Sequence, residues 1–171
     1  MVVKSPKEMF RMLLSEMRQN TGEAVNIYLE LAHLVSDPQV KETLESRAFT
    51  SEKTFERLDE CFDLVGEQPV RLSGRLQQFF MEEFRKELAE IQSSAGRQLF
   101  ILAKLNQLTQ LRIAEYTILI AAADMAGLHE ASVLLGSCLL DRLAFVEGTH
   151  GLIRSMVEKK RGERKAAARA A

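Results

Sequence analysis

Four long stretches of this sequence repeat apolar residues at alternating steps of three and four positions, with proline or glycine at the breaks. This period places the apolar side chains on one face of an α-helix. The first stretch opens with Ser5-Pro6-Lys7-Glu8, which carries the residues that favour a helix N-terminus. Ser36-Asp37-Pro38 separates the first stretch from the second in the same way. The pattern predicts four long helices that bury their apolar faces against one another.

The predicted elements follow one another with short breaks. The first long helix follows Ser5 and ends at Ser36, and the second runs from Pro38 to Gly66. A connector over 66–74 leads to a short helix from Arg75 to about Ile91, which is followed by a break over 93–96. The third long helix ends near Gly127, and the fourth begins at about His129. Short connections make the first two and the last two long helices antiparallel. The expected fold is all-α: an antiparallel four-helix bundle over residues 1–158, with a short extra helix between the second and third long helices.

The third long helix is apolar nearly all round, because leucine and isoleucine also flank its core-facing stripe. A helix of this kind is covered on several sides. We expect the bundle to cover one side, and either the short helix or a second subunit to cover another.

Charge and composition exclude several classes of protein. The net charge is −1 at pH 7, so no overall field favours nucleic acid or an anionic membrane. The most apolar stretch, from Ile113 to Leu140, contains charged residues that argue against a membrane span. The N-terminus lacks the apolar segment of a secretory signal. Cys61 and Cys138 lie in apolar runs, which is typical of buried reduced thiols, so a cytoplasmic protein is expected.

Residues 159–171 are rich in lysine and arginine and have no apolar face. A segment with this composition cannot bury enough apolar surface to order itself against the bundle. We expect a basic, disordered C-terminal tail.

The apolar stripes are interrupted by polar residues at one level, near the middle of each long helix. These residues are Thr21, Ser51 with Glu52, Thr109 with Arg112, and Arg142 beside Asp141. Buried polar groups are costly unless they are paired, so a shared polar layer indicates a site or the remnant of one. Metal and cofactor sites of helix bundles are built at such a level.

The predicted layer lacks the ligands of a dinuclear metal centre. A carboxylate-bridged pair of ions needs about four acidic side chains and two histidines that point inward. The layer offers Glu52 and Asp141 and no histidine. Arg112 and Arg142 would repel the cations, and arginine stays protonated at any accessible pH. We expect Arg112 or Arg142 to pair with Asp141 or Glu52 instead.

Other candidate ligands lie away from this level. Two Glu-x-x-His pairs, Glu30 with His33 and Glu147 with His150, each share a helix face. Ordinary surface residues are the favoured interpretation, and a transition-metal site would require the helix ends at His33 and His150 to meet. A metal centre with unusual ligands would need six carboxylates to converge. These are Glu23, Glu30, Glu52, Glu83, Asp141 and Glu147. No nucleophile lies near a histidine, and no catalytic residue is predicted.

The run from Ile113 to Leu139, with its Ile-Ala-Glu-Tyr segment, alanine-rich turn, glycine and Ala-Ser-Val-Leu-Leu, resembles the YciE/YciF-type ferritin-like family. Phe10-Arg-Met-Leu-Leu-Ser-Glu16, Glu56-Arg-Leu-Asp59 and Phe62-Asp-Leu-Val-Gly-Glu-Gln-Pro69 are also similar to it. The resemblance spans roughly residues 8 to 157. It implies a dimer-forming four-helix bundle with a dinuclear metal site and a link to stress responses.

The sequence departs from that family at the metal-ligand positions. Thr21 stands where the family has the glutamate of the first helix, and Phe49 and Glu52 stand where it has the Glu-x-x-His of the second. The family's Glu/His cluster of the third helix corresponds to Thr109, Gln110 and Arg112. Its acidic cluster of the fourth helix corresponds to Asp141, Arg142 and Val146. Glu83 matches an acidic position in the short helix. The resemblance thus implies the fold, with a metal site whose ligands have been replaced.

Three hypotheses for function follow. The favoured one is a non-catalytic, stress-associated scaffold that has lost its dinuclear metal site, needs no cofactor, and acts as a homodimer or by binding a protein partner. The second is a di-iron or di-manganese protein with oxidase or peroxide-scavenging activity and unusual ligands. The third is a carrier of a small apolar ligand, which would require a continuous cavity between the helices.

Overall fold

The described residues, 3–72 and 75–170 of a computed structural model, form five α-helices and no strand. The helices are α1 (Pro6–Leu34), α2 (Pro38–Val65), α3 (Arg75–Glu90), α4 (Ser94–Met125) and α5 (His129–Ala170). The predicted connector over 66–74 ends in residues 73 and 74, which lie outside the described residues, as do 1, 2 and 171. The all-α prediction is confirmed.

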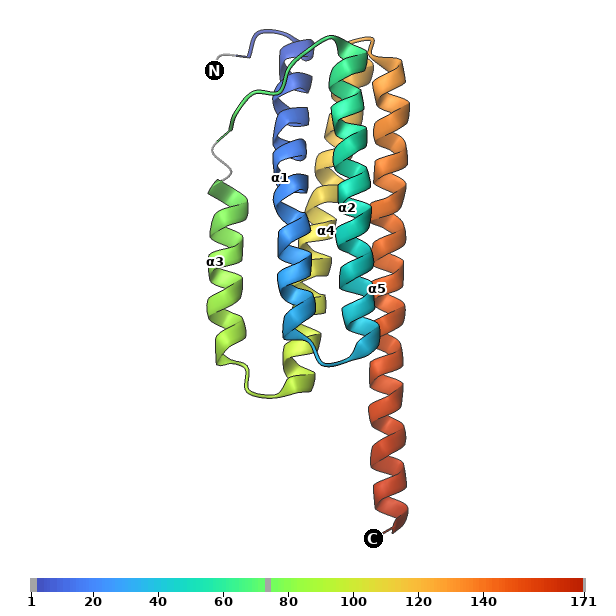
Figure 1. Cartoon of the computed structure of the whole chain (residues 1–171). Coiled ribbons are helices and arrows are strands. Elements are labelled where there is room, and N and C mark those ends of the chain that lie inside the picture. Colours follow the sequence, from blue (N-terminus) through green and yellow to red (C-terminus); the bar gives the residue numbers. More distant parts are fainter. Residues whose placement is uncertain (1–2, 73–74, 171) are drawn as a thin grey trace.

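α1, α2, α4 and α5 form a four-helix bundle, and α3 stands beside α1 and α4 (Figure 1). The chain descends along α1, returns along α2, crosses to α3 and descends again before α4 and α5 (Figure 1). α1 packs on α2 and α4, and α5 packs on the same two helices. Each of these neighbours runs in the opposite direction, so the predicted antiparallel bundle with an extra short helix is confirmed.

The helix ends form where the sequence signals predict them. Ser5 is the N-cap of α1, and its side chain accepts a hydrogen bond from the Glu8 amide at 3.2 Å. Asp37 caps α2 by accepting from the amides of Gln39 and Val40 at 2.9 and 3.3 Å. Gly66 ends α2 with a φ of 65°, a left-handed conformation that glycine adopts without steric cost.

The predicted break over 93–96 is shorter in the structure. Ser93 is the N-cap of α4, and its side chain accepts from the Gly96 amide at 3.2 Å. The helix therefore begins at Ser94, and Gly96 lies in its first turn. A serine-rich run of this kind favours a helix start as much as a loop, because its hydroxyls satisfy free amides.

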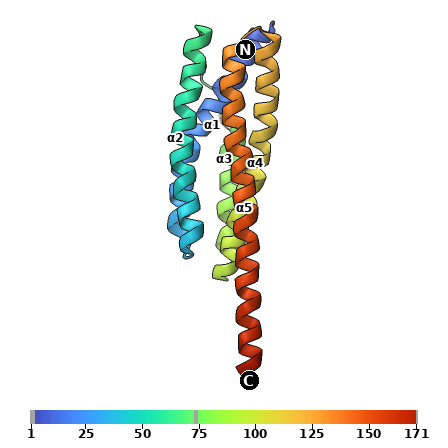
Figure 2. The ribbon, with the colours of Figure 1, turned by 90° about the vertical axis from the view of Figure 1, so that its right-hand side faces the viewer.

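The basic C-terminal segment, predicted to be disordered, continues α5 as a helix to Ala170. α5 extends well beyond the lower end of the bundle, as Figure 2 shows. The reason is local: alanine, lysine and arginine are among the strongest helix formers, so the segment prolongs an existing helix without a packed face. The described part of the chain contains no helix long and apolar enough to cross a membrane.

The core consists of two apolar clusters, one at each end of the bundle. The upper cluster gathers Phe10, Leu14, Leu58, Phe62, Leu119 and Leu135 among others. The lower cluster gathers Leu31, Leu44, Ile101 and Leu102, together with Met81, Phe84 and Leu88 of α3. Phe84 stacks on Phe100 with ring centroids 5.6 Å apart. α3 therefore covers the lower half of α4, as one of the two predicted alternatives requires.

Two leucines of α1 test this core. Leu31 is 1% exposed, whereas Leu29, two positions earlier, is 41% exposed. Leu31→Ala should lower the free energy of unfolding by about 2–5 kcal/mol, because it removes buried contacts and leaves a cavity. Leu29→Ala should cost less than about 1 kcal/mol. Chemical denaturation followed by circular dichroism measures both, and equal losses would contradict the packing.

Candidate functional site

A layer of buried polar side chains separates the two apolar clusters, and all four bundle helices contribute to it. The exposed fractions are 4% for Thr21, 0% for Ser51, 1% for Thr109 and 4% for Arg142. Thr54 of α2 and Thr149 of α5 are also buried. The polar layer predicted in mid-bundle is present at these positions.

Several hydroxyls of the layer are satisfied within their own helices. Thr109 Oγ1 donates to the Leu105 carbonyl at 2.8 Å, and Thr54 Oγ1 donates to the Thr50 carbonyl at 2.8 Å. Such bonds to the preceding turn leave no free donor. Two other hydroxyls, Ser51 Oγ and Tyr116 OH, are buried without a hydrogen-bond partner among the described residues. Burial raises the pKa of Tyr116 well above its usual value, so this phenol keeps its proton.

Arg142 brings a permanent positive charge into the layer. Its Nε is buried and has no partner among the described residues, and its Cζ lies 5.9 Å from the centre of the Tyr116 ring. A guanidinium placed over an aromatic face is attracted by the ring quadrupole. Aromatic contact thus takes the place of a carboxylate around this side chain.

A second buried guanidinium, that of Arg47, was not predicted from sequence. Arg47 is 3% exposed and lies over the Phe145 ring at 4.5 Å and the Tyr28 ring at 5.7 Å. Its Nε donates a long hydrogen bond, 3.5 Å, to Tyr28 OH. The signal was available: Arg47 lies four residues before Ser51, where the alternating step of three and four continues the buried stripe of α2.

The predicted ion pairs of the layer are wrong. Asp141 accepts from Arg57 Nη1 at 2.7 Å, and Arg112 pairs with Glu115. Neither Arg142 nor Arg47 forms an ion pair with any carboxylate among the described residues. The reason is helical rotation: adjacent residues point about 100° apart, so Arg142 faces the core while Asp141 faces α2.

At three other positions that correspond to metal ligands of the family, the side chains also point away from the centre. Phe49 is 61% exposed on α2, and Glu52 and Gln110 are exposed. Val146 is buried but apolar. Glu52 follows Ser51 directly, so the same rotation that buries the serine turns the carboxylate to solvent.

Arg112 instead links α4 to α3. Its Nη2 donates to Gln77 Oε1 at 2.7 Å, and Gln77 Nε2 in turn donates to the Asn20 carbonyl at 3.3 Å and to Glu23 Oε2 at 3.2 Å. Gln77 is 4% exposed. This network joins α3 to both α1 and α4, and it engages Glu23, one of the candidate metal ligands.

The remaining candidate ligands are dispersed. Glu30 pairs with Arg85 at 2.7 Å, which lowers the pKa of the Glu30 carboxyl, and Glu83 pairs with Lys86 at 2.7 Å. Glu147 and His33 are exposed, and His150 Nε2 lies 3.5 Å from Asn106 Nδ2. Within the described ranges, no three acidic, histidine or cysteine side chains are grouped so as to hold a metal ion. The six carboxylates named for an unusual metal centre therefore do not converge.

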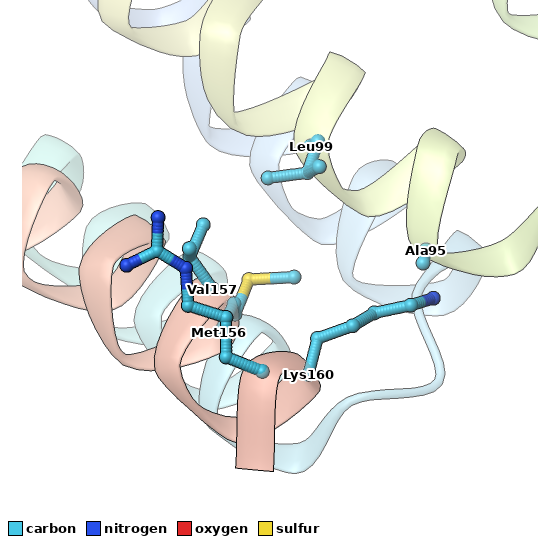
Figure 3. Close-up of a pocket in the computed structure, with 6 residues that line it drawn as sticks. Ala95, Leu99, Met156, Val157 and Lys160 are labelled. Carbon is cyan, nitrogen blue, oxygen red and sulfur yellow. The ribbon is translucent and has the colours of Figure 1, made fainter. Parts of the chain in front are cut away.

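Grooves on the surface offer little to an apolar ligand. The most apolar ones include a groove of about 240 Å³ between α4 and α5, where Ala95 and Leu99 face Met156, Val157 and Lys160 (Figure 3). Cavities that enclose small ligands measure roughly 300–1,000 Å³. A groove of this size, open to solvent and flanked by Lys160 and Arg161, does not resemble the continuous cavity that a carrier needs.

The comparisons with known proteins agree with this architecture. The model of a family described as "Domain of unknown function (DUF892)" matches residues 5–160. The chain belongs to the DUF892 family. No curated protein matches its sequence. The predicted resemblance to YciE/YciF-type ferritin-like proteins is confirmed by solved structures that share the fold.

One of these is the Escherichia coli stress protein YciF, with a TM-score of 0.86 at 20% identity over 92% of this chain and 99% of YciF. YcfI from Rhodopseudomonas palustris, for which a structural role has been suggested, gives 0.82 at 18% identity over 86% of this chain and 94% of YcfI. A protein from Xanthomonas campestris gives 0.68 at 15% identity over 92% of this chain and 99% of that one. At these identities the likeness concerns the fold.

The residues of this DUF892 protein do not fit the dinuclear site that ferritin-like bundles hold at their centre. Such a site needs inward carboxylates and imidazoles. The interior here presents threonine and serine hydroxyls, the Tyr116 phenol and the guanidiniums of Arg47 and Arg142. Permanent positive charge at that level opposes divalent cations rather than binding them.

The two cysteines are buried and free, as predicted. Burial raises the pKa of Cys61 to about 12. Burial also raises the pKa of Cys138, although the nearby Arg57 guanidinium opposes this effect. Because the thiolate is the reactive form, both groups are poor nucleophiles near neutral pH.

We predict that neither thiol reacts with a chromogenic disulfide reagent at pH 8 in the native protein. A raised pKa leaves almost no thiolate at that pH, and burial blocks access. The same reagent should titrate both thiols after unfolding in guanidinium, which is the control. Rapid stoichiometric labelling of the folded chain would contradict the structure, and Cys61→Ala would show which thiol is involved.

Proposed function

We propose that this protein is a non-catalytic, stress-associated scaffold of the ferritin-like fold that has lost its dinuclear metal site. The polar layer is the observation that supports this proposal. Arg47 and Arg142 are buried there together with hydroxyl groups, whereas a dinuclear metal site would require inward carboxylates. A bundle centre of this kind has neither metal ligands nor an activated nucleophile. Its work is then done by its surface, through a second copy or a protein partner.

The acidic side chains support this proposal by the use to which they are put. Arg18 pairs with Asp59 between α1 and α2, and Arg57 pairs with Asp141 between α2 and α5. Glu87 accepts from Lys104 between α3 and α4. Each surface pair contributes at most about 1 kcal/mol, but together they fix the helices relative to one another. Carboxylates placed between helices on the outside serve rigidity rather than metal binding.

Two further features support a stress-associated protein of the cytoplasm. The E. coli protein that shares the fold is described as a stress protein. Cys61 and Cys138 are unpaired, which agrees with a reducing compartment.

Metal content tests the loss of the site. Purified full-length protein, loaded with Fe(II) without oxygen or with Mn(II) and then desalted, should retain far less than one ion per chain by elemental analysis, because its interior is cationic. Saturable retention near two ions per chain, as a dinuclear centre requires, would overturn the proposal. Asp141→Asn is the control for any residual binding, since this carboxylate directly precedes Arg142 of the layer in the chain.

The scaffold is further proposed to be a homodimer formed by α4. Leu111, Ala114, Ile118, Ala121 and Met125 are all exposed and repeat at steps of three and four, which is the spacing of a coiled-coil seam. Ile118 is 59% and Met125 is 76% exposed. This stripe lies on the upper half of α4, beyond the part that α3 covers. A second copy aligned on the same stripe would bury it symmetrically.

Ile118→Lys should convert the dimer into a monomer, because it places a charge at the centre of the seam. Phe49→Lys is the matched control. The exposed fraction of Phe49, 61%, is close to the 59% of Ile118, but Phe49 lies on α2 and not on the stripe of α4. Light scattering after size exclusion should show half the mass for the first variant and an unchanged mass for the second. A monomeric parent protein, or a dimer that survives Ile118→Lys, would contradict this interface.

A further inference from the structure

The positive charges of Arg47 and Arg142 form no ion pair with a carboxylate among the described residues. Arg47 and Arg142 are 3% and 4% exposed. The acidic residue next to Arg142 in the chain, Asp141, is engaged by Arg57 at 2.7 Å. Glu52, the acid nearest to Ser51 in sequence, is turned to solvent. Two like charges enclosed together are unfavourable unless something of the opposite sign joins them.

Helical spacing and aromatic contacts bring hydrogen-bond donors near these two side chains. Ser51 lies one turn after Arg47 on the same face of α2, and Phe145 lies three residues after Arg142 on α5. Arg47 is over the Phe145 ring, and Arg142 is beside the Tyr116 ring. The positive charge of Arg47 also acts on Tyr116, where it partly offsets the rise in pKa that burial causes. The two side chains therefore approach a common region.

Three buried polar atoms of this region have no formed hydrogen bond among the described residues: Arg142 Nε, Ser51 Oγ and Tyr116 OH. The Thr21 side chain lies close enough to Tyr116 to offset part of the rise in its pKa, without the geometry of a formed hydrogen bond. All three can donate a hydrogen bond, and the tyrosine keeps its proton. Buried donors without acceptors are rare in folded proteins and call for an explanation such as a bound ion. Donors of this kind around a positive centre match the requirements of an anion and oppose those of a cation.

We propose that the centre of the bundle binds a small monovalent inorganic anion, of the size of chloride, between the guanidiniums of Arg47 and Arg142. The Tyr116 and Ser51 hydroxyls would complete its shell. The anion would neutralise part of the buried charge and satisfy donors that otherwise lose their water. This site depends on the geometry of the layer alone, so it stands or falls separately from the scaffold and dimer proposals.

A groove that is open to solvent reaches Arg47. It lies between α2 and α5, has a volume of about 440 Å³ and is lined by Arg47, Phe145, Ser46 and Thr50 among others. Glu42 and Asp141 also line it. Acidic side chains along the route disfavour large, multiply charged anions such as nucleotides more than a single halide. The route thus agrees with a small monovalent ligand.

Thermal unfolding in sodium bromide tests the proposal, with sodium gluconate holding the ionic strength constant. Bromide should raise the unfolding midpoint in a saturable way, because a ligand that binds only the folded state stabilises it by mass action. Arg142→Met and Arg47→Met should each abolish the bromide-dependent shift. Arg85→Met is the matched control: it removes one charge from a surface pair with Glu30 and should keep the full shift.

A measurement on the unaltered chain guards against variants that fail to fold. Crystals soaked in bromide should give an anomalous peak between the side chains of Arg47 and Arg142. Equal midpoints in bromide and gluconate would overturn the proposal, and so would a shift that both interior variants retain, which would indicate a general salt effect. Water alone at the centre of a bromide-soaked crystal would overturn it as well.

Discussion

The interior of this bundle is governed by two guanidinium groups that cannot lose their charge. Arginine remains protonated even when buried, so the surrounding structure has to accommodate the charge. Arg47 rests against Phe145 and Tyr28, and Arg142 against Tyr116. Aromatic faces and hydroxyls surround these charges in place of carboxylates. The same arrangement disfavours divalent cations at the centre, because both guanidiniums repel them.

The fold tolerates this polar layer because its apolar core is divided. One cluster packs the upper ends of the four helices, and the other packs the lower ends together with α3. α1, α2 and α4 have 29, 28 and 32 residues, which is long enough for apolar contacts on both sides of the layer. Each cluster aligns the same four helices independently. The centre is therefore free to vary in chemistry without loss of the architecture, as the low identity to proteins of the same fold also suggests.

The sequence was sufficient for the fold because periodicity and capping act locally and agree with one another. Ser5 and Asp37 cap the starts of α1 and α2, and Gly66 caps the end of α2, as predicted. The polar residues of the layer are buried as their stripe positions require: Thr21, Ser51, Thr109 and Arg142. Partner choice was not predictable in this way. Whether Asp141 meets Arg142 or Arg57 depends on how α2 and α5 are rotated against each other, and sequence spacing within one helix carries no information on that. The helical continuation to Ala170 was missed because composition was weighed without helix propensity.

Charge placement connects the interior with the surface. Two candidate metal ligands, Asp141 and Glu30, are turned outward, where each meets an arginine from another helix, as Asp59 also does. Those contacts hold α1, α2, α3 and α5 in place without reaching the core. The apolar stripe of α4 from Leu111 to Met125 is left facing solvent by the same rigid arrangement. The acids thus stabilise the bundle from outside, while the apolar stripe of α4 stays accessible to solvent.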